Sequence, residues 1–245
     1  RRQDGLLPGA GLDQRFLKDS NERARLALES VEMWLKIDPT LPLVLCDGSS
    51  YDFSEQVARL FPLARIECLP FENNQELVKQ YGRGYGEGEI VRYALHHSKL
   101  IAQAGCFAKC SSKLWVENFH DCMRYWNGRL LLKGVFLNVF SPTRRTEFSY
   151  IDTRFYVAST EAYVRHFEDA HLQIGKRKGY GLENSFHDIV LAHGIRQSLS
   201  RVAPVICGVG GGTGTYYRNS SLRRLKEELR LWLVRLNPAF HDLFV

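Results

Sequence analysis

The sequence predicts an α/β fold in which a mostly parallel central sheet is flanked by helices. Two observations lead to this prediction. Short continuous apolar runs, such as residues 43–46, are typical of strands that a parallel sheet buries on both faces. Runs of this kind alternate along the chain with segments of helical periodicity, which is the order expected of a sheet covered by helices.

The first half of the chain defines the expected order of elements. A helix over residues 14–37 ends before two prolines, and the strand at 43–46 follows. Asp52 and Glu55 have capping-box spacing before a short helix that runs to Leu60. Further strands are expected at residues 65–69, 107–109, 114–116, 130–140, 151–157 and 202–207. Further helices are expected near residues 90–101, 160–170, 183–193 and 220–236.

A single domain over residues 1–245 is predicted, because the chain has no internal repeat and no low-complexity linker. The helix at 220–236 is amphipathic, with leucines and Trp232 on one side and arginines over the rest. Packing on its own domain is one expectation for this helix. Docking on a membrane surface or on a partner is the other.

Composition excludes several classes of protein. In the 245 residues, apolar residues make up 44% and charged residues 24%, as in ordinary globular proteins. No run approaches the roughly 18 apolar residues of a membrane span, and no signal-peptide pattern opens the chain. The chain begins without methionine, so an upstream segment stays open. The six cysteines form no Cys-x-x-Cys pair, which indicates reduced thiols and a cytoplasmic location.

The net charge of +6 indicates an anionic partner. Nucleic acid, the phosphates of a nucleotide and an anionic membrane surface all meet this description. Charge alone does not separate them.

A nucleotide contact is predicted at Asp47, Gly48 and Ser49, directly after the strand at 43–46. In open parallel sheets ligands bind beyond the carboxyl ends of strands. The aspartate can accept hydrogen bonds from a ribose or a base, and the glycine allows close approach of the backbone. The alternative is an ordinary turn with a helix cap.

A second ligand contact is predicted in the glycine-rich segment at the start of the next long helix. Alternating glycines expose backbone amides near a helix N-terminus, which favours phosphate binding, and an arginine adds charge. The alternative is a flexible loop. The residues assigned to this contact are Arg83, Gly84, Tyr85, Gly86 and Glu87.

Glu183 is the candidate general base, because it stands at the expected start of a helix. Asp152 and Arg154, at the start of a strand, are candidate catalytic or substrate-contacting residues. Each has a structural alternative: a first-turn acid that stabilises its helix, or an ion pair at a strand end. The glycine run at 208–214 is expected to be a loop that closes over a ligand.

The order of these motifs resembles the GT-A glycosyltransferases, in particular the inverting family of bacterial polysaccharide enzymes. The resemblance covers residues 41–193. It rests on the Asp47-Gly48-Ser49 turn, on a second strand followed by Asn73, on the glycine-containing helix start and on Glu183.

One motif departs from that family. An Asp-x-Asp metal motif is expected after the strand at 107–109, but the chain reads Lys109-Cys110-Ser111 there, with Lys113 close behind. Lys109, Lys113 or Arg83 can supply the positive charge that a diphosphate leaving group needs. No metal-ligating set is assigned. A divalent cation stays open as a cofactor, with Glu117 as the best single candidate ligand.

The resemblance implies an inverting transfer of a sugar from a nucleoside-diphosphate donor to a glycan or lipid-linked glycan. It places the protein in the biosynthesis of lipopolysaccharide or capsule, in the cytoplasm or peripherally at the inner membrane, with no nucleic-acid partner. The main alternative is a non-catalytic protein that binds nucleotides or nucleic acid with basic and aromatic residues. A methyltransferase or dehydrogenase would need an early glycine turn, and the main glycine turns come late.

Overall fold

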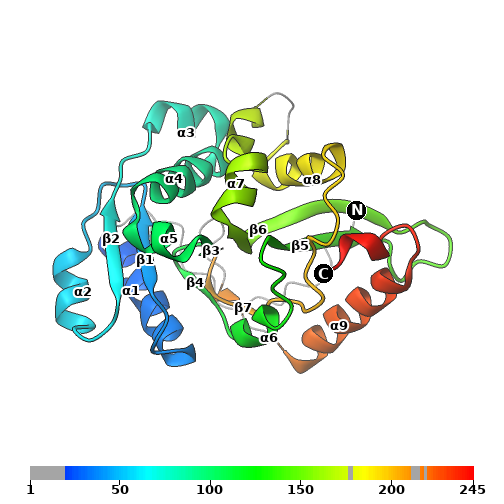
Figure 1. The fold of residues 1–245 in the computed structure, drawn as a ribbon, viewed down its shortest axis with the longest axis horizontal. Helices are drawn as coiled ribbons and strands as arrows, with labels where there is room; N and C mark the ends of the chain where they lie inside the picture. Colours follow the sequence, from blue (N-terminus) through cyan, green and yellow to red (C-terminus); the bar gives the residue numbers. More distant parts are fainter. Residues whose placement is uncertain (1–19, 176–178, 211–215, 218–219) are drawn as a thin grey trace.

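The computed structural model describes residues 20–175, 179–210, 216–217 and 220–245 of the chain. The described strands form three small sheets, with strand orders β1-β2, β3-β6-β5 and β4-β7-β8. In Figure 1 the first sheet lies at the left beside α1 and α2. The sheet that contains β5 and β6 lies right of the centre, with α7 and α8 above it and α9 below.

The first sheet is parallel. β1 (Leu43–Asp47) pairs with β2 (Ile66–Pro70), with Leu45 opposite Cys68, and α2 (Ser54–Leu60) forms the crossover. α1 (Ser20–Ile37) covers this sheet through an apolar cluster that includes Val31 and Leu45. The parallel βαβ order predicted for this part of the chain is confirmed.

The second sheet is antiparallel and has the long strand β6 (Glu147–Ser159) at its centre. β3 (Cys106–Cys110) pairs along one edge of β6 and β5 (Leu130–Leu137) along the other. Much of the core lies between this sheet and the helices α7 (Thr160–His166) and α8 (Leu182–Ala192). Aromatic rings dominate that core, among them Tyr156, Tyr163, Phe167 and Phe186.

The third sheet connects α1 with the second half of the chain through hydrogen bonds and strand pairing. β4 (Leu114–Val116) pairs antiparallel with β7 (Ile206–Val209), which in turn pairs with β8 (Tyr216–Tyr217). From α1, the Ser30 hydroxyl and the Trp34 indole both donate to the Leu114 carbonyl oxygen, at 2.8 and 3.2 Å. The predicted closing loop at 208–214 falls largely on residues 211–215, which lie outside the described residues.

The prediction of a mostly parallel central sheet is wrong. The apolar runs do form strands, but the described strands beyond β2 pair only antiparallel. Two physical reasons account for the difference. A run of apolar residues reports that both faces of a strand are covered, and burial of this kind is independent of strand direction. The connection from β5 to β6 is a hairpin of nine residues, 138–146, and a hairpin connection imposes antiparallel pairing.

The glycine-rich segment forms a helix and not a loop. α4 (Arg83–His97) follows α3 (Gln75–Tyr81) directly and leads to α5 (Lys99–Ala104). Its glycines allow close packing: a Cβ at Gly84 would lie 3.2 Å from Leu182, and one at Gly88 would lie 2.3 Å from His171. Glycine costs about 1 kcal/mol in a helix interior relative to alanine, and here that cost permits contacts with α8 and the neighbouring turn.

The remaining described elements complete the C-terminal half. They are α6 (Phe119–Met123), η2 (Ala170–Gln173), α9 (Ser221–Leu236) and η3 (His241–Leu243). α9 occupies the stretch where the amphipathic helix was predicted and buries Leu231 and Val234. No helix in the described part of the chain is both long enough and apolar enough to cross a membrane.

Candidate functional site

The carboxyl end of β1 places Asp47 beside α1. Its Oδ1 accepts a hydrogen bond from the Arg23 guanidinium at 3.3 Å and another from the Ser49 backbone N–H at 2.9 Å. The Ser49 hydroxyl also donates to the same oxygen. The Asp47-Gly48-Ser49 turn is therefore preorganised by its own aspartate, and Arg23 adds a cation that the sequence did not indicate.

Three cationic side chains gather at this turn. Half-buried Lys113 has its pKa lowered by burial and by the nearby charges of Arg23 and Arg83, while Asp47 acts in the opposite direction. The helix α1, the start of α4 and the segment after β3 thus bring these groups within electrostatic reach of one another. Two carboxylates, Asp47 and Glu22, also act on Lys113, so three cations face two anions and the net charge of the cluster favours a bound anion.

Lys109 occupies a different environment. Its side chain is only 9% exposed, and its ammonium contacts Glu87 Oε1 at 2.5 Å and the Thr153 carbonyl oxygen at 2.7 Å. The Ser111 hydroxyl oxygen lies 3.3 Å from the Lys109 nitrogen, so each of the three N–H groups of the ammonium has an acceptor. Lys109 and Glu87, both predicted to contact a nucleotide donor, therefore neutralise each other and join α4 to β3 and β6.

We predict that Lys109→Met lowers the free energy of unfolding by about 2 kcal/mol, because Glu87 and the Thr153 carbonyl lose a buried donor. Chemical denaturation measures this loss. Lys113→Met is the matched control and is expected to leave stability within about 0.5 kcal/mol. If Lys109→Met kept full stability and lost only ligand binding, Lys109 would be a ligand contact after all.

Asn73 connects the turn after β1 with α4. A Cβ at Gly48 would lie 2.0 Å from the Asn73 amide nitrogen, and one at Gly86 would lie 2.9 Å from the same atom. The Asn73 backbone N–H donates to the Gly48 carbonyl oxygen at 3.0 Å. The Asn73 Oδ1 atom is buried and has no hydrogen-bond partner among the described residues. Both glycines are thus required by one side chain, and its free acceptor is unusual in a native fold.

The N-termini of α4 and α8 meet. Gly84 packs against Leu182, the first residue of α8, so Arg83 and Glu183 lie on neighbouring helix starts. Glu183 is half-buried, and a Cβ at Gly181 would lie 2.8 Å from its carboxylate. Within the described residues, no hydrogen bond or ion pair engages that carboxylate. The predicted base is therefore not engaged by another described residue, and its helix begins beside the start of α4.

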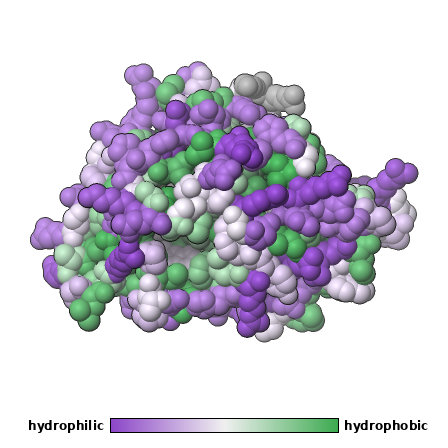
Figure 2. Space-filling model, viewed as in Figure 1, coloured by the Kyte–Doolittle hydropathy of each residue, from purple (hydrophilic) through white to green (hydrophobic). Residues whose placement is uncertain are grey.

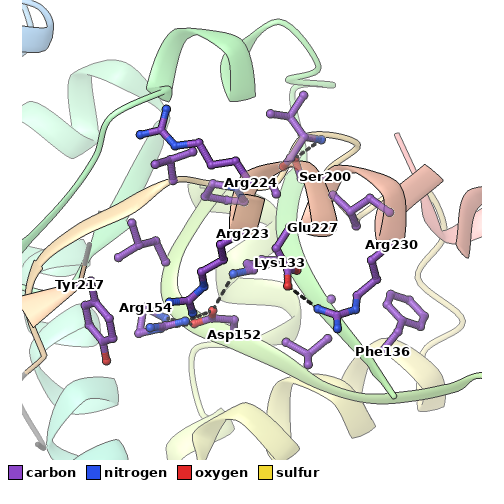
Figure 3. A pocket seen from close by; sticks show the side chains of 18 of the residues that line it. Lys133, Phe136, Asp152, Arg154, Ser200, Tyr217, Arg223, Arg224, Glu227 and Arg230 are labelled. Atoms are coloured by element: carbon purple, nitrogen blue, oxygen red, sulfur yellow. Dashed lines mark hydrogen bonds and ion pairs between the residues drawn. The ribbon is translucent and has the colours of Figure 1, made fainter. Parts of the chain in front are cut away.

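A cavity of about 250 Å³ lies between β5, β6, the 200–206 segment and α9 (Figure 3). Asp152 forms its floor and is almost fully buried, with 6% of its side chain exposed. Arg154 donates to both Asp152 oxygens, at 2.8 and 2.6 Å, and Lys133 approaches to 3.2 Å. Burial alone would raise the pKa of Asp152, but these two cations hold it well below its usual range.

The opposite wall of the cavity comes from α9. In Figure 3, Arg223 extends from this helix toward Asp152 and Arg154, whereas Arg224 points in another direction. Arg224 pairs with Glu117, and its buried Nε has no hydrogen-bond partner in the part of the chain that the structure describes. Five cationic and two anionic side chains line the cavity, namely Lys133, Arg154, Arg223, Arg224, Arg230, Asp152 and Glu227. The cavity therefore favours an anionic ligand.

Aromatic side chains border the same cavity. The Arg154 guanidinium lies 5.0 Å from the centre of the Tyr217 ring. Burial raises the pKa of the Tyr150 hydroxyl, and the carboxylates of Asp152 and Glu183 raise it further. Tyr150 lines the cavity, whereas Glu183 is not among the residues that line it.

The structure brings the residues predicted from the sequence together in separate groups. Asp47, Arg83 and Lys113 lie within electrostatic reach of one another, Asp152 and Arg154 line the cavity, and Glu183 stands at the start of α8, beside the start of α4. Several contributors have no recognisable signal in the sequence, because they are isolated residues on helices or strands. These are Arg23, Lys133, Tyr150 and Arg223.

The place where a metal motif was expected does not fit a divalent cation, because Lys109, within β3, puts an ammonium and not a carboxylate there. Glu117, the single candidate ligand, pairs with Arg224 instead. The described residues contain no group of three or more His, Cys, Asp or Glu side chains that could hold a metal. Comparisons with protein-family models, with curated proteins and with solved structures find no match.

Proposed function

We propose that the protein transfers a sugar from a nucleoside-diphosphate donor to a hydroxyl of an anionic glycan or lipid-linked glycan. One observation carries the proposal. The cations Arg23, Arg83 and Lys113 gather near the carboxyl end of β1, and the start of α4, which carries Arg83, packs against the start of α8, which carries Glu183. Transfer from such a donor needs both features: positive charge for the departing diphosphate and a base for the attacking hydroxyl.

The donor binds at the Asp47 turn. Arg83 and Lys113 contact the diphosphate, and their fixed charges stabilise the negative charge that develops on it as the bond to the sugar breaks. The Asp47-Gly48-Ser49 turn contacts the nucleoside, and Asn73 supports this turn through the hydrogen bond from its backbone N–H to the Gly48 carbonyl oxygen. The ion pair of Lys109 and Glu87 holds α4 in place for donor binding, and neither side chain touches the donor.

The acceptor binds in the cavity floored by Asp152, and its attacking hydroxyl extends out of the cavity toward Glu183, which is not one of the lining residues. Glu183 takes the proton of the attacking hydroxyl, the new C–O bond forms at the anomeric carbon, and the diphosphate leaves from the opposite face with the bonding electron pair. The configuration at that carbon is therefore inverted. Asp152 stays ionised between Arg154 and Lys133, so it positions the acceptor and does not take the proton.

The cytoplasm is the proposed site of action. All six cysteines are free thiols, which favours a reducing compartment. Synthesis of a surface polysaccharide from activated sugars takes place where nucleoside-diphosphate sugars are made, and this is the process that we propose for the protein.

A turnover assay tests the proposal. The protein is incubated with a panel of sugar nucleotides that covers the common bases, with and without manganese, and the release of nucleoside diphosphate is measured. Release that increases with an added glycan acceptor is expected for at least one donor. No release with any donor, together with salt-sensitive binding of oligonucleotides, would contradict the proposal and favour the nucleic-acid alternative.

Donor binding is expected to weaken at alkaline pH. Lys113 has a pKa below the ordinary lysine value of 10.5, because of burial and of its cationic neighbours. Its ammonium is charged below that pKa, so affinity for a nucleoside diphosphate is constant at neutral pH and falls as the pH rises through it. Titration calorimetry over a pH series measures the fall. Lys113→Arg keeps its charge throughout and should remove this dependence; a wild-type affinity that does not fall would contradict the assignment.

A further inference from the structure

α9 presents an uncovered apolar stripe to solvent. Five large side chains follow one another at spacings of three and four residues, which places them on one face of the helix. They are Leu222, Leu225, Leu229, Trp232 and Leu236, with exposed fractions of 80, 63, 47, 53 and 61%. A contiguous patch of this kind is uncommon on a protein that stays free in water and marks an interaction surface.

The fold does not need this stripe. α9 is anchored by its opposite face, where Leu231 is 9% and Val234 1% exposed. Glu227 and Arg230 on that face line the cavity described above. The helix therefore has two apolar faces, one for its own domain and one for something else.

Basic groups accompany the stripe. The Lys226 and Arg230 cations lie 5.9 and 5.5 Å from the centre of the Phe140 ring, which is itself 45% exposed. Phe140 belongs to the β5–β6 connection, where Arg144 and Arg145 are exposed as well. Over the region of α9, at the lower right of Figure 2, hydrophobic side chains are interspersed with hydrophilic ones.

Charge decides between the possible occupants. Of the five cationic side chains of α9, Arg223, Arg224 and Arg230 line the cavity, whereas Lys226 and Arg235 do not; the helix has two anionic side chains, and the chain as a whole carries +6. Two copies of α9 packed stripe to stripe would bring like charges together, which disfavours self-association. An anionic lipid surface complements both features, since it takes up the apolar stripe and attracts the cations beside it. Trp232 is of the residue type that favours the boundary between water and lipid.

We propose that α9, with Phe140 and the exposed arginines of the β5–β6 connection, docks the protein on an anionic bilayer surface. The helix lies in the plane of the interface with Leu225 and Leu229 inserted. This inference does not depend on sugar transfer. If both proposals hold, docking brings the cavity on the other face of α9 to the membrane, where a lipid-linked acceptor would be presented.

Vesicle co-sedimentation tests the inference. The full chain is mixed with vesicles of phosphatidylcholine alone or of phosphatidylcholine and phosphatidylglycerol in equal parts. Binding to the anionic vesicles is expected, and high salt should weaken it. The double variant L225E/L229E is expected to bind at least about tenfold more weakly, because it removes two inserted side chains and adds two negative charges.

Leu63→Glu is the matched control. Leu63 is 99% exposed and follows α2, on the opposite side of the molecule from α9, so this variant should bind the vesicles like the wild type (Figure 1). Equal binding of wild type and L225E/L229E would overturn the inference. Equal binding to neutral and anionic vesicles would overturn it too. Sedimentation equilibrium provides a third test. If the wild type were a dimer and L225E/L229E a monomer, the stripe would be covered by a second copy, and the inference would be overturned.

Discussion

Glu183→Gln is expected to lower the rate of sugar transfer by at least about two orders of magnitude while donor binding stays unchanged. A general base contributes about 10²–10⁴-fold to a rate, and glutamine cannot take the proton. The substitution preserves shape, and within the described residues the Glu183 carboxylate has no hydrogen bond or ion pair to lose. The folded state should therefore be unaffected. Product formation with saturating donor and acceptor measures the rate, and calorimetry with the nucleoside diphosphate measures binding.

Glu161→Gln is the control for this experiment. Glu161 also stands in the first turn of a helix, α7, but its side chain is 80% exposed and pairs with Arg165 on the surface. It should transfer sugar at the wild-type rate. Near-normal transfer by Glu183→Gln would remove the base from the mechanism and leave Glu183 as an acid that only stabilises its helix.

Asp152→Asn is expected to lower the free energy of unfolding by about 3 kcal/mol, because removing one partner of a buried ion pair leaves its cations uncompensated. Arg154 and Lys133 both depend on this one carboxylate. Chemical denaturation provides the measurement, and Glu147→Gln, an exposed acid on the same strand, is the control. A loss below about 1 kcal/mol would show that the pair is solvated and contributes little.

The stability difference between wild type and Asp152→Asn is expected to depend on pH. A carboxyl group whose pKa is depressed on folding contributes stability above its unfolded pKa, near 3.8 here, and loses it as the pH falls toward the folded value. The difference between wild type and Asp152→Asn should therefore be constant from neutral pH to about pH 4 and shrink on further acidification. A difference that grew with acidification would contradict the depressed pKa of Asp152.

The sequence predicted strands better than it predicted their directions. Residues 43–46 and 65–69 lie in parallel neighbours because a helix separates them. The strands around residues 107–109 and 151–157 were equally recognisable, but they pair antiparallel with each other, and β5 pairs with β6 through a hairpin. Apolar patterning records which residues are buried, and it contains no information on which strand lies beside which.

The glycine-rich segment illustrates a second limit. Low helix propensity at Gly84, Gly86 and Gly88 favours a loop, yet the segment is helical because each glycine faces a close neighbour. Leu182 lies against Gly84, Asn73 against Gly86 and His171 against Gly88. Each of these neighbours is distant in sequence from its glycine. Tertiary contact overrides local preference here, and a single sequence does not show the contact.

The candidate site was predictable where a residue follows a recognisable strand or begins a helix. Asp47 and Glu183 meet this condition. Lys109 shows why type and position are insufficient: a lysine after a strand reads as a phosphate contact, but burial against Glu87 commits it to an internal pair. Arg23 was unpredictable for the opposite reason, since an arginine on an amphipathic helix usually faces solvent.

Calorimetric titration of wild type and Lys113→Ala with nucleoside diphosphates tests the central claim most directly. Lys36→Ala, an exposed lysine about 20 Å along α1 from Arg23, is the control. The account predicts micromolar-class binding of at least one nucleoside diphosphate, about tenfold or more weaker in Lys113→Ala and unchanged in Lys36→Ala. Equal affinities in wild type and Lys113→Ala, or no binding of any nucleoside diphosphate, would contradict a donor site at the end of β1.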